Sequence, residues 1–317
     1  MILDWVYVGL GLVILLLAGD LLVKGAVNLA LRLGIPALIV SLTIVAFGTS
    51  APELLISIDA VLDGQSGLAI GNVVGSNTAN VLLVLGIPAL ISTLDTSECE
   101  ARKSYILMLL GTALFIGLAF MAPFEWWHGL VLLGALALIL LDQAREARAH
   151  RKDSMDDEEE EELEGEDPDL PKWRLALYLV LGLVGLPLGA DLLVEGATDI
   201  AREFNVSDAA IGLTLVAIGT SLPELATTVV AAWRRQADVA LGNVIGSNMF
   251  NLLAIVGVTA LVAPIEVAAE FLRLDFWIML AASLVLAPFV FLKWKMSRAM
   301  GAAFSVVYVA YLVFVLS

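Results

Sequence analysis

The sequence contains a polar stretch that reads Gly48-Thr49-Ser50-Ala51-Pro52-Glu53 and continues, after an apolar run, as Gly71-Asn72-Val73-Val74-Gly75-Ser76-Asn77. Both parts recur 171 residues later, without a gap, as Gly219-Thr220-Ser221-Leu222-Pro223-Glu224 and Gly242-Asn243-Val244-Ile245-Gly246-Ser247-Asn248. Between residues 42 and 54, 10 of 13 residues are identical to their partners, and between 71 and 80, 7 of 10 are. A duplicated half with identical polar residues predicts one site that both copies build together.

The composition is typical of a membrane protein. Apolar residues make up 60% of the 317-residue chain, and the mean hydropathy is +0.93, whereas soluble domains hold about 45 to 50% apolar residues. The net charge of −16 is a local feature, because residues 156–169 hold 11 acidic residues and no basic one. No basic patch indicates nucleic-acid binding, and the single cysteine, Cys99, excludes an intrachain disulfide.

Ten apolar runs are long enough to cross a hydrocarbon core of about 30 Å. The first five cover roughly 5–23, 36–61, 67–93, 104–122 and 126–142, and the second five roughly 174–194, 207–232, 238–263, 273–292 and 300–316. We therefore predict an all-α polytopic membrane protein of ten transmembrane helices. Its parts are an N-terminal five-helix repeat (1–142), a charged cytoplasmic linker (143–172) and a C-terminal five-helix inverted repeat (173–317).

The basic residues predict how these helices are oriented in the cell membrane. With ten spans, 15 of the 17 Lys and Arg residues fall on one side, and only Arg202 and Arg273 fall on the other. The positive-inside rule places the basic side, with the central loop, in the cytoplasm and both termini outside. Because the two copies lie five spans apart, they enter the membrane in opposite directions, so the repeats are predicted to be inverted.

Internal Gly, Pro and polar residues predict discontinuous helices in spans two, three, seven and eight. Helical spacing puts Thr49 and Glu53 on one face with Ser50 beside them. Pro52 removes a backbone donor and frees a carbonyl near Gly48. Free carbonyls inside a membrane are tolerated where they line a cavity or meet an ion, so the breaks in spans two and seven indicate a cation site.

Glu53 and Glu224 are the acidic groups of the repeated stretch. An ionised carboxylate in the hydrocarbon layer costs on the order of 2.5 to 3.5 kcal/mol unless it has a partner, and neither span contains Lys or Arg. A bound cation is the expected partner; the alternative, a pair of protonated structural acids, leaves the repetition unexplained. The neighbouring groups are oxygen donors, which suit a hard cation such as Ca²⁺: Thr49, Ser50, Ser76 and Asn80, and Thr220, Ser221, Ser247 and Asn251.

The doubled motif resembles the paired α-repeats of the Ca²⁺/cation antiporter superfamily and is most similar to its sodium/calcium exchanger branch. With its flanks it covers about half the chain. The resemblance implies exchange of Na⁺ for Ca²⁺, with both as transported ions and no organic cofactor. It implies that Glu53 and Glu224 carry Ca²⁺ with the backbone oxygens of Thr49 and Thr220. The implied outward Na⁺ site is Ala217, Thr220, Ser221 and Ser247, the inward one is Ala46, Thr49, Ser50 and Ser76, and Asn80 and Asn251 flank the centre.

The sequence departs from the family pattern at the centre of the site. Family members often carry Asp at one of the two positions occupied here by Asn80 and Asn251. Without a third carboxylate, the centre should hold a cation weakly or hold water. K⁺-dependent relatives carry Asp at the position of Asn251, so the resemblance implies exchange that is independent of K⁺. Antiport of H⁺ for Ca²⁺ is the alternative exchange, and a passive cation channel would use the same ligands. A membrane enzyme is disfavoured, because the His-Glu-x-x-His and Gly-x-Ser-x-Gly motifs are absent.

The central linker is expected to begin as a helical extension and to continue as a disordered acidic run. The run from Asp156 to Asp169 lacks the ligand spacing and turn glycine of an EF-hand loop. We therefore interpret it as a solvated linker, with a regulatory cation site as the alternative. The expected partners of the chain are Ca²⁺, Na⁺ and the lipid bilayer.

Overall fold

The computed structural model describes residues 2–97, 99–153, 170–204 and 217–316, which form helices and short connections without a β-sheet. The first half contains α1 (Ile2–Leu33), α2 (Ala37–Val40), η1 (Ser41–Val45), α3 (Ala46–Thr49), α4 (Ala51–Leu62), α5 (Ser66–Ala79), η2 (Asn80–Val84), α6 (Gly86–Ile91), α7 (Arg102–Ala119) and α8 (Trp126–Asp153). The second half contains α9 (Lys172–Glu203), α11 (Ala217–Thr220), α12 (Leu222–Trp233), α13 (Ala237–Met249), η4 (Phe250–Ile255), α14 (Val256–Val262), η5 (Phe271–Asp275), α15 (Phe276–Val285), α16 (Ala287–Phe291) and α17 (Arg298–Leu316). The elements η1, η2, η4 and η5 are π-helical.

Eight helices of the described residues are long and apolar enough to cross a membrane, and a bent pair from Ala37 to Leu62 makes a ninth. The bent pair changes direction by 42° between α3 and α4, at Ser50. The predicted run 207–232 falls partly on residues 205–216, which lie outside the described part of the chain. The count of ten spans therefore stays a prediction, as does the acidic run at 156–169, which also lies outside the described residues.

Spans three and eight differ from the prediction of discontinuous helices. Each continues as one helix of 26 residues, Ser66–Ile91 and Ala237–Val262. The polar residues there produce a π-helical turn, η2 or η4, instead of a break. A π-helical turn keeps the backbone hydrogen-bonded while it displaces the side chains around it.

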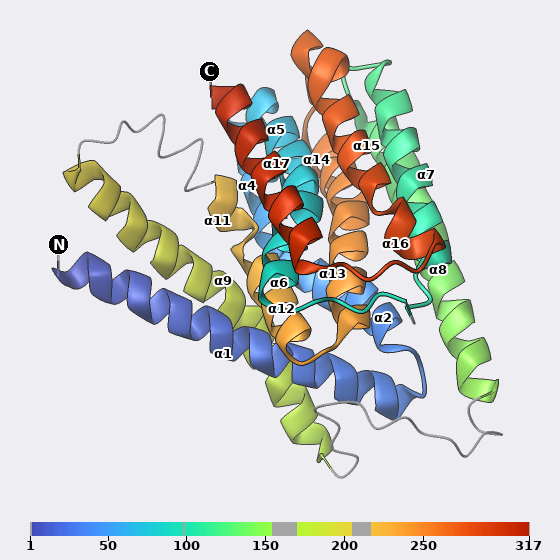
Figure 1. The fold of residues 1–317 in the computed structure, drawn as a ribbon. Helices are drawn as coiled ribbons and strands as arrows, with labels where there is room; N and C mark the ends of the chain where they lie inside the picture. The colour runs from blue at the N-terminus through green and yellow to red at the C-terminus, as the bar shows by residue number, and fades with distance from the viewer. Residues whose placement is uncertain (1, 98, 154–169, 205–216, 317) are drawn as a thin grey trace.

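The outer helices α1 and α9 are also longer than predicted, at 32 residues each. Figure 1 shows them side by side, slanting away from the remaining bundle. Glycines allow their backbones to approach closely. A Cβ on Gly11 would lie 2.6 Å from the backbone nitrogen of Leu193, and one on Gly182 would lie 2.6 Å from the Cβ of Leu22.

The helix bounds repeat at the same offset as the sequence. α4 and α12 cover residues 51–62 and 222–233, and α3 and α11 end at the equivalent residues 49 and 220. Two isolated β-bridges join the halves, between Leu94 and Met296 and between Phe124 and Ile265. The duplication is thus a property of the backbone as well as of the motif.

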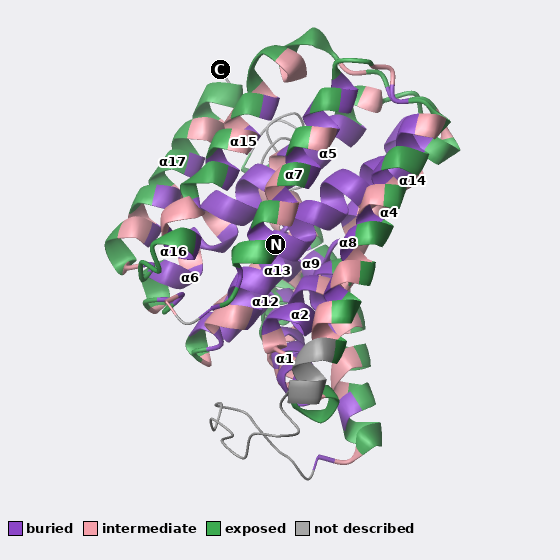
Figure 2. Cartoon of the chain, turned by 90° about the vertical axis from the view of Figure 1, so that its right-hand side faces the viewer, coloured by how far each residue is buried: buried purple, intermediate pink, exposed green. Residues whose placement is uncertain are grey.

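The core lies around α5 and α13. Within its most apolar window, the helix Ala237–Val262 is 89% buried and Ser66–Ile91 is 72% buried, whereas the window of α17 is only 17% buried. Figure 2 shows this contrast, with buried residues in α12 and α13 and exposed ones along α17 and α8. Large apolar side chains such as Leu17 and Val306 are exposed on the outer helices, as expected of surfaces that face lipid.

α13 packs closely on the first part of span two, which comprises α2, η1 and α3, because glycines of α13 face that segment. A Cβ on Gly242 would lie 2.8 Å from the carbonyl oxygen of Leu38, and one on Gly246 would clash with that of Leu42 and lie 2.6 Å from the Cβ of Ala46. This agrees with the small-xxx-small pattern of these glycines. In the first copy, a Cβ on Gly71 would lie 3.7 Å from Phe271 and one on Gly75 would meet no described atom within 4 Å.

We expect Gly246→Ala to lower the melting temperature of the purified protein by several degrees. Its methyl group would displace backbone and cost roughly 1 to 3 kcal/mol, more than the roughly 1 kcal/mol that alanine gains in a helix. Gly117→Ala in α7 is the matched control, because no described atom lies within 4 Å of its Cβ. Equal melting curves for both variants, recorded by tryptophan fluorescence, would contradict the close packing of α13.

Candidate cation-binding site

Each glutamate of the repeated stretch lies in the first turn of a half-helix. Glu53 follows Pro52 at the beginning of α4, and Glu224 follows Pro223 at the beginning of α12. Proline suits the first helical turn, where no backbone donor is needed, and the positive end of the helix dipole favours a carboxylate there. The residue before each half-helix is a serine whose hydroxyl does not cap the helix, so it is available to the site.

Both carboxylates are completely buried, with 0% exposed surface. Ser76 Oγ donates to Oε1 of Glu53 at 3.5 Å, and Ser50 Oγ donates to Oε1 of Glu224 at 3.4 Å. The Oε2 atom of each glutamate has no hydrogen-bond partner among the described residues. No Lys or Arg of the described residues lies within ion-pair distance of either acid.

Hydrogen bonds between the halves bring the two glutamates to one place. Ser50 belongs to the first copy but donates to Glu224 of the second. Ser76 Oγ, which contacts Glu53, lies 3.4 Å from Ser221 Oγ and accepts a hydrogen bond from Asn251 Nδ2 at 3.1 Å. The sequence expectation that residues of both copies form one site therefore agrees with the contacts of these side chains.

Several further oxygens of the predicted site are buried without a hydrogen-bond partner. They are Asn80 Oδ1, Asn251 Oδ1 and Ser247 Oγ, on residues with 0% exposed surface. A buried polar atom without a partner costs about 1 to 3 kcal/mol. Together with the two Oε2 atoms they form a set of acceptors that a cation would satisfy.

The predicted threonines and alanines precede these residues in the chain. The Thr49 hydroxyl is already engaged in hydrogen bonds. Thr49 Oγ1 donates to the carbonyl of Ala46 at 3.3 Å and to Asn243 Oδ1 at 3.5 Å. The Ala46 carbonyl also accepts the backbone N–H of Ser50 at 3.1 Å. Thr220 ends α11, whose first described residue is Ala217, and borders a cavity of about 340 Å³.

Two asparagines that the sequence did not assign to the site donate hydrogen bonds to the backbone carbonyls of the two glutamates. Asn72 Nδ2 donates to the carbonyl of Glu53 at 3.1 Å and to Ser57 Oγ at 3.0 Å. Its counterpart Asn243 donates to the carbonyl of Glu224 at 3.4 Å and to Thr228 Oγ1 at 3.2 Å. The sequence repeat could have indicated their role, because asparagine recurs at both positions of the 171-residue offset.

Asn77 and Asn248 join the two copies of the second motif. Asn77 Nδ2 donates to the backbone carbonyl of Asn248 at 3.2 Å, and Asn80 Nδ2 donates to Asn248 Oδ1 at 3.1 Å. These hydrogen bonds fix α5 and η2 against α13. They thereby join the helices that carry Ser76 and Ser247.

The site contains two acidic groups and otherwise neutral oxygens. The described residues hold no group of three or more His, Cys, Asp or Glu that could bind a metal. The arrangement therefore combines two carboxylates with hydroxyl and amide oxygens, a set of ligands of the kind that hard cations prefer.

Comparisons with known proteins agree with this chemistry. The sequence profile of the family described as sodium/calcium exchanger protein matches residues 3–144 and 174–317. The putative antiporter CaxA of Alkalimonas amylolytica is 39% identical over 90% of this chain and 89% of its own length. The sodium/calcium exchanger MaX1 of Methanosarcina acetivorans is 35% identical over 96% of each chain.

Solved structures of the sodium-calcium exchanger NCX_Mj share the fold. The crystal soaked with 2.5 mM Na⁺ and 1 mM Sr²⁺ superposes with a TM-score of 0.83 at 31% identity, covering 99% of this chain and 98% of the other. The crystal soaked without Na⁺ and Ca²⁺ superposes with a TM-score of 0.82 at 30% identity, covering 99% of each chain.

We expect Asn243→Ala to weaken Ca²⁺ binding about tenfold, because the Glu224 carbonyl loses a donor and the Thr49 hydroxyl loses an acceptor; about 1.4 kcal/mol corresponds to that factor. The measurement is the Ca²⁺-dependent rise of the melting temperature, which follows site occupancy. Thr78→Val is the control, because Thr78 is equally buried but bonds only within its own helix, to Val74 at 3.0 Å. Unchanged Ca²⁺ stabilisation in the Asn243 variant would show that the asparagine does not position the ligands.

Proposed function

The chain belongs to the sodium/calcium exchanger family, and from that premise we propose that it exchanges Na⁺ for Ca²⁺ across the membrane by alternating access. The protein is an integral membrane protein of a transport family and not an enzyme. The observation that supports the proposal most is the pair of fully buried carboxylates, Glu53 and Glu224, whose free oxygens lack a cationic partner among the described residues. Such a pair is stable in a membrane when a cation neutralises it.

Charge balance sets the expected stoichiometry. One Ca²⁺ matches the two fixed negative charges, whereas more than two Na⁺ in the same site would move net charge, so exchange is electrogenic. Na⁺ and Ca²⁺ compete for overlapping oxygens, so they bind alternately. An empty site would carry two unneutralised carboxylates through the hydrocarbon layer, which disfavours its crossing. K⁺ is not required, because the centre of the site holds Asn80 and Asn251 and no third carboxylate.

The site residues divide between the transported ions. Glu53 and Glu224 carry Ca²⁺ with the backbone oxygens of Thr49 and Thr220. Outward Na⁺ is held by Ala217, Thr220, Ser221 and Ser247, and inward Na⁺ by Ala46, Thr49, Ser50 and Ser76. The free hydroxyl of Ser247 and the hydrogen bond between Ser50 and Glu224 support this division.

Ten spans in two inverted repeats would carry out the exchange, with both termini outside and the linker in the cytoplasm. The repeated helix bounds of α3, α4, α11 and α12 support the duplication. The close, glycine-lined contact between α1 and α9 supports a mobile pair that slides past the rigid centre of α5 and α13.

Uptake of Ca²⁺ into proteoliposomes tests the proposed function. An outward-directed Na⁺ gradient should drive uptake, and imposed K⁺ or H⁺ gradients should not. Uptake driven by H⁺ instead of Na⁺ would replace this proposal with H⁺/Ca²⁺ antiport. Equal uptake without any counter-ion gradient would indicate a passive channel.

We expect Glu53→Gln and Glu224→Gln each to reduce Na⁺-driven Ca²⁺ uptake to the level of empty vesicles. Each variant leaves one fixed charge, which cannot balance a divalent cation in a low-dielectric site. Glutamine preserves shape, so the elution profile in size-exclusion chromatography should stay unchanged. Rapid Ca²⁺ exchange by either variant would show that the substituted glutamate is not part of the transport site.

We expect Asn251→Asp to strengthen cation binding at the centre of the site. The added carboxylate replaces an amide whose Oδ1 is buried without a partner, and it would attract a further cation. The measurement is the K⁺ dependence of Ca²⁺ uptake, compared with the parent chain in the same vesicles. Identical dependence on Na⁺ and K⁺ in both proteins would show that Asn251 does not contact the central ion.

A further inference from the structure

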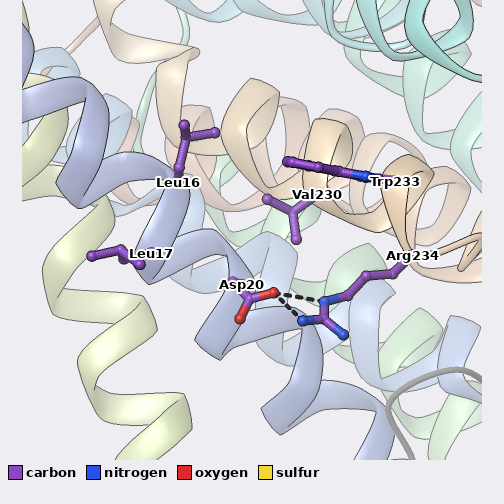
Figure 3. Close-up of a pocket in the computed structure, with 6 residues that line it drawn as sticks. All are labelled: Leu16, Leu17, Asp20, Val230, Trp233 and Arg234. Atoms are coloured by element: carbon purple, nitrogen blue, oxygen red, sulfur yellow. Dashed lines mark hydrogen bonds and ion pairs between the residues drawn. The ribbon is translucent and has the colours of Figure 1, made fainter.

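One ion pair links the outer helix α1 to the bundle. Asp20 of α1 accepts a hydrogen bond from Arg234 Nε at 2.6 Å and also contacts Nη2 of the same guanidinium. Its second oxygen pairs with Lys24 Nζ at 2.9 Å. Figure 3 shows the guanidinium of Arg234 reaching across from the end of α12 to Asp20.

The ion pair closes the charged end of an otherwise apolar cavity. The cavity measures about 490 Å³ and is lined on α1 by Leu16 and Leu17 and on α12 by Val230 and Trp233. The Arg234 and Asp20 side chains are only 25% and 30% exposed, so water screens them less than a fully exposed pair. Nearby, the backbones touch, since a Cβ on Gly19 would lie 3.3 Å from the carbonyl oxygen of Ala226.

The sequence repeat does not reproduce this ion pair. At the 171-residue offset Asp20 corresponds to Asp191, Lys24 to Glu195 and Arg234 to Asp63. All three counterparts are acidic and exposed. The same approach of α9 to α4 would therefore bring like charges together, where α1 and α12 bring opposite charges together.

The two sides of the site also differ in how accessible their equivalent threonines are. On the side of Asp191 and Glu195, a cavity of about 340 Å³ reaches Thr220, which is 9% exposed. On the side of Asp20, the equivalent residue Thr49 is 1% exposed, and the cavity beside the ion pair does not reach it. Among the described residues, the Asp20 side of the site is therefore the more enclosed of the two.

We propose that Asp20 and Arg234 form a latch that holds α1 against α12 and favours the access state in which their side is closed. Lys24 contributes by holding the second oxygen of Asp20. In the proposed orientation the latched side is cytoplasmic, so the transporter rests open to the outside. The inference relies on the proposed alternating access, because only then does α1 move relative to α12.

Distances between spin labels measure the latch directly. Labels on Leu33→Cys at the end of α1 and Leu292→Cys beyond α16, both at exposed positions, report the position of α1 against the bundle in a Cys99→Ser background. We expect Arg234→Gln to raise the population of the displaced α1 about threefold or more, as loss of a partly buried ion pair implies. Arg235→Gln, at the exposed neighbouring arginine, should leave the distances unchanged.

Two further variants keep the test informative if Arg234→Gln folds poorly. Asp20→Asn should have the same effect as Arg234→Gln, and the double variant should add little to either, because both changes break one interaction. Asp63→Arg at the exposed end of α4 offers Asp191 a partner, so it should shift the population away from the resting state. The latch would be overturned if Arg234→Gln, Asp20→Asn and Asp63→Arg all left the distances unchanged. Equal effects of Arg234→Gln and Arg235→Gln would also overturn it.

Transport measurements keep the two proposals apart. A chain with no Na⁺-driven Ca²⁺ uptake but with latch-dependent distances would contradict the proposed function and support the latch. A chain with normal uptake whose α1 position ignores Asp20 and Arg234 would contradict the latch alone.

Discussion

Two buried carboxylates without a protein counter-charge are the constraint on which the rest of the structure depends. Glu53 and Glu224 have no exposed surface and no cationic neighbour among the described residues. In a low-dielectric interior such charges must be neutralised from outside the chain. The helix breaks at Ser50 and Ser221 place hydroxyls beside the acids, and the asparagine supports hold the glutamate carbonyls in place. Each of these features places polar groups around carboxylates that no described cationic side chain neutralises.

The fold separates a buried centre from two outer helices. α5 and α13 carry the second motif in the most buried part of the bundle, where close backbone contacts and asparagine hydrogen bonds between the copies fix their relation. α1 and α9 lie outside this centre and pack on each other through glycines. Contacts of that kind are close but largely apolar, so sliding along them breaks few hydrogen bonds. The Asp20–Arg234 pair is an exception, because it is directional and charged.

Much of the site could be predicted from the sequence because its chemistry is repeated. The duplicated polar residues predicted a site at both glutamates, whose contacts across the two copies the structure shows, and Pro52 with Gly48 indicated the bend that the structure has at Ser50. The supporting role of Asn72 and Asn243 was not predicted, since an asparagine in a helix could equally face a neighbouring helix. The π-helical turns at η2 and η4 were interpreted as breaks, because the same polar residues suit both. The lengths of α1 and α9 depend on their mutual packing, which hydropathy alone does not encode.

The β-bridges between Leu94 and Met296 and between Phe124 and Ile265 have a consequence for how the chain is assembled. Each bridge ties a connecting segment of one half to one of the other, and the ion pair of Asp95 with Lys295 reinforces the first. With the shared site between them, the halves are fastened at several points that do not involve the peptide connection from α8 to α9. The two halves therefore present complementary surfaces to each other that do not depend on their covalent connection.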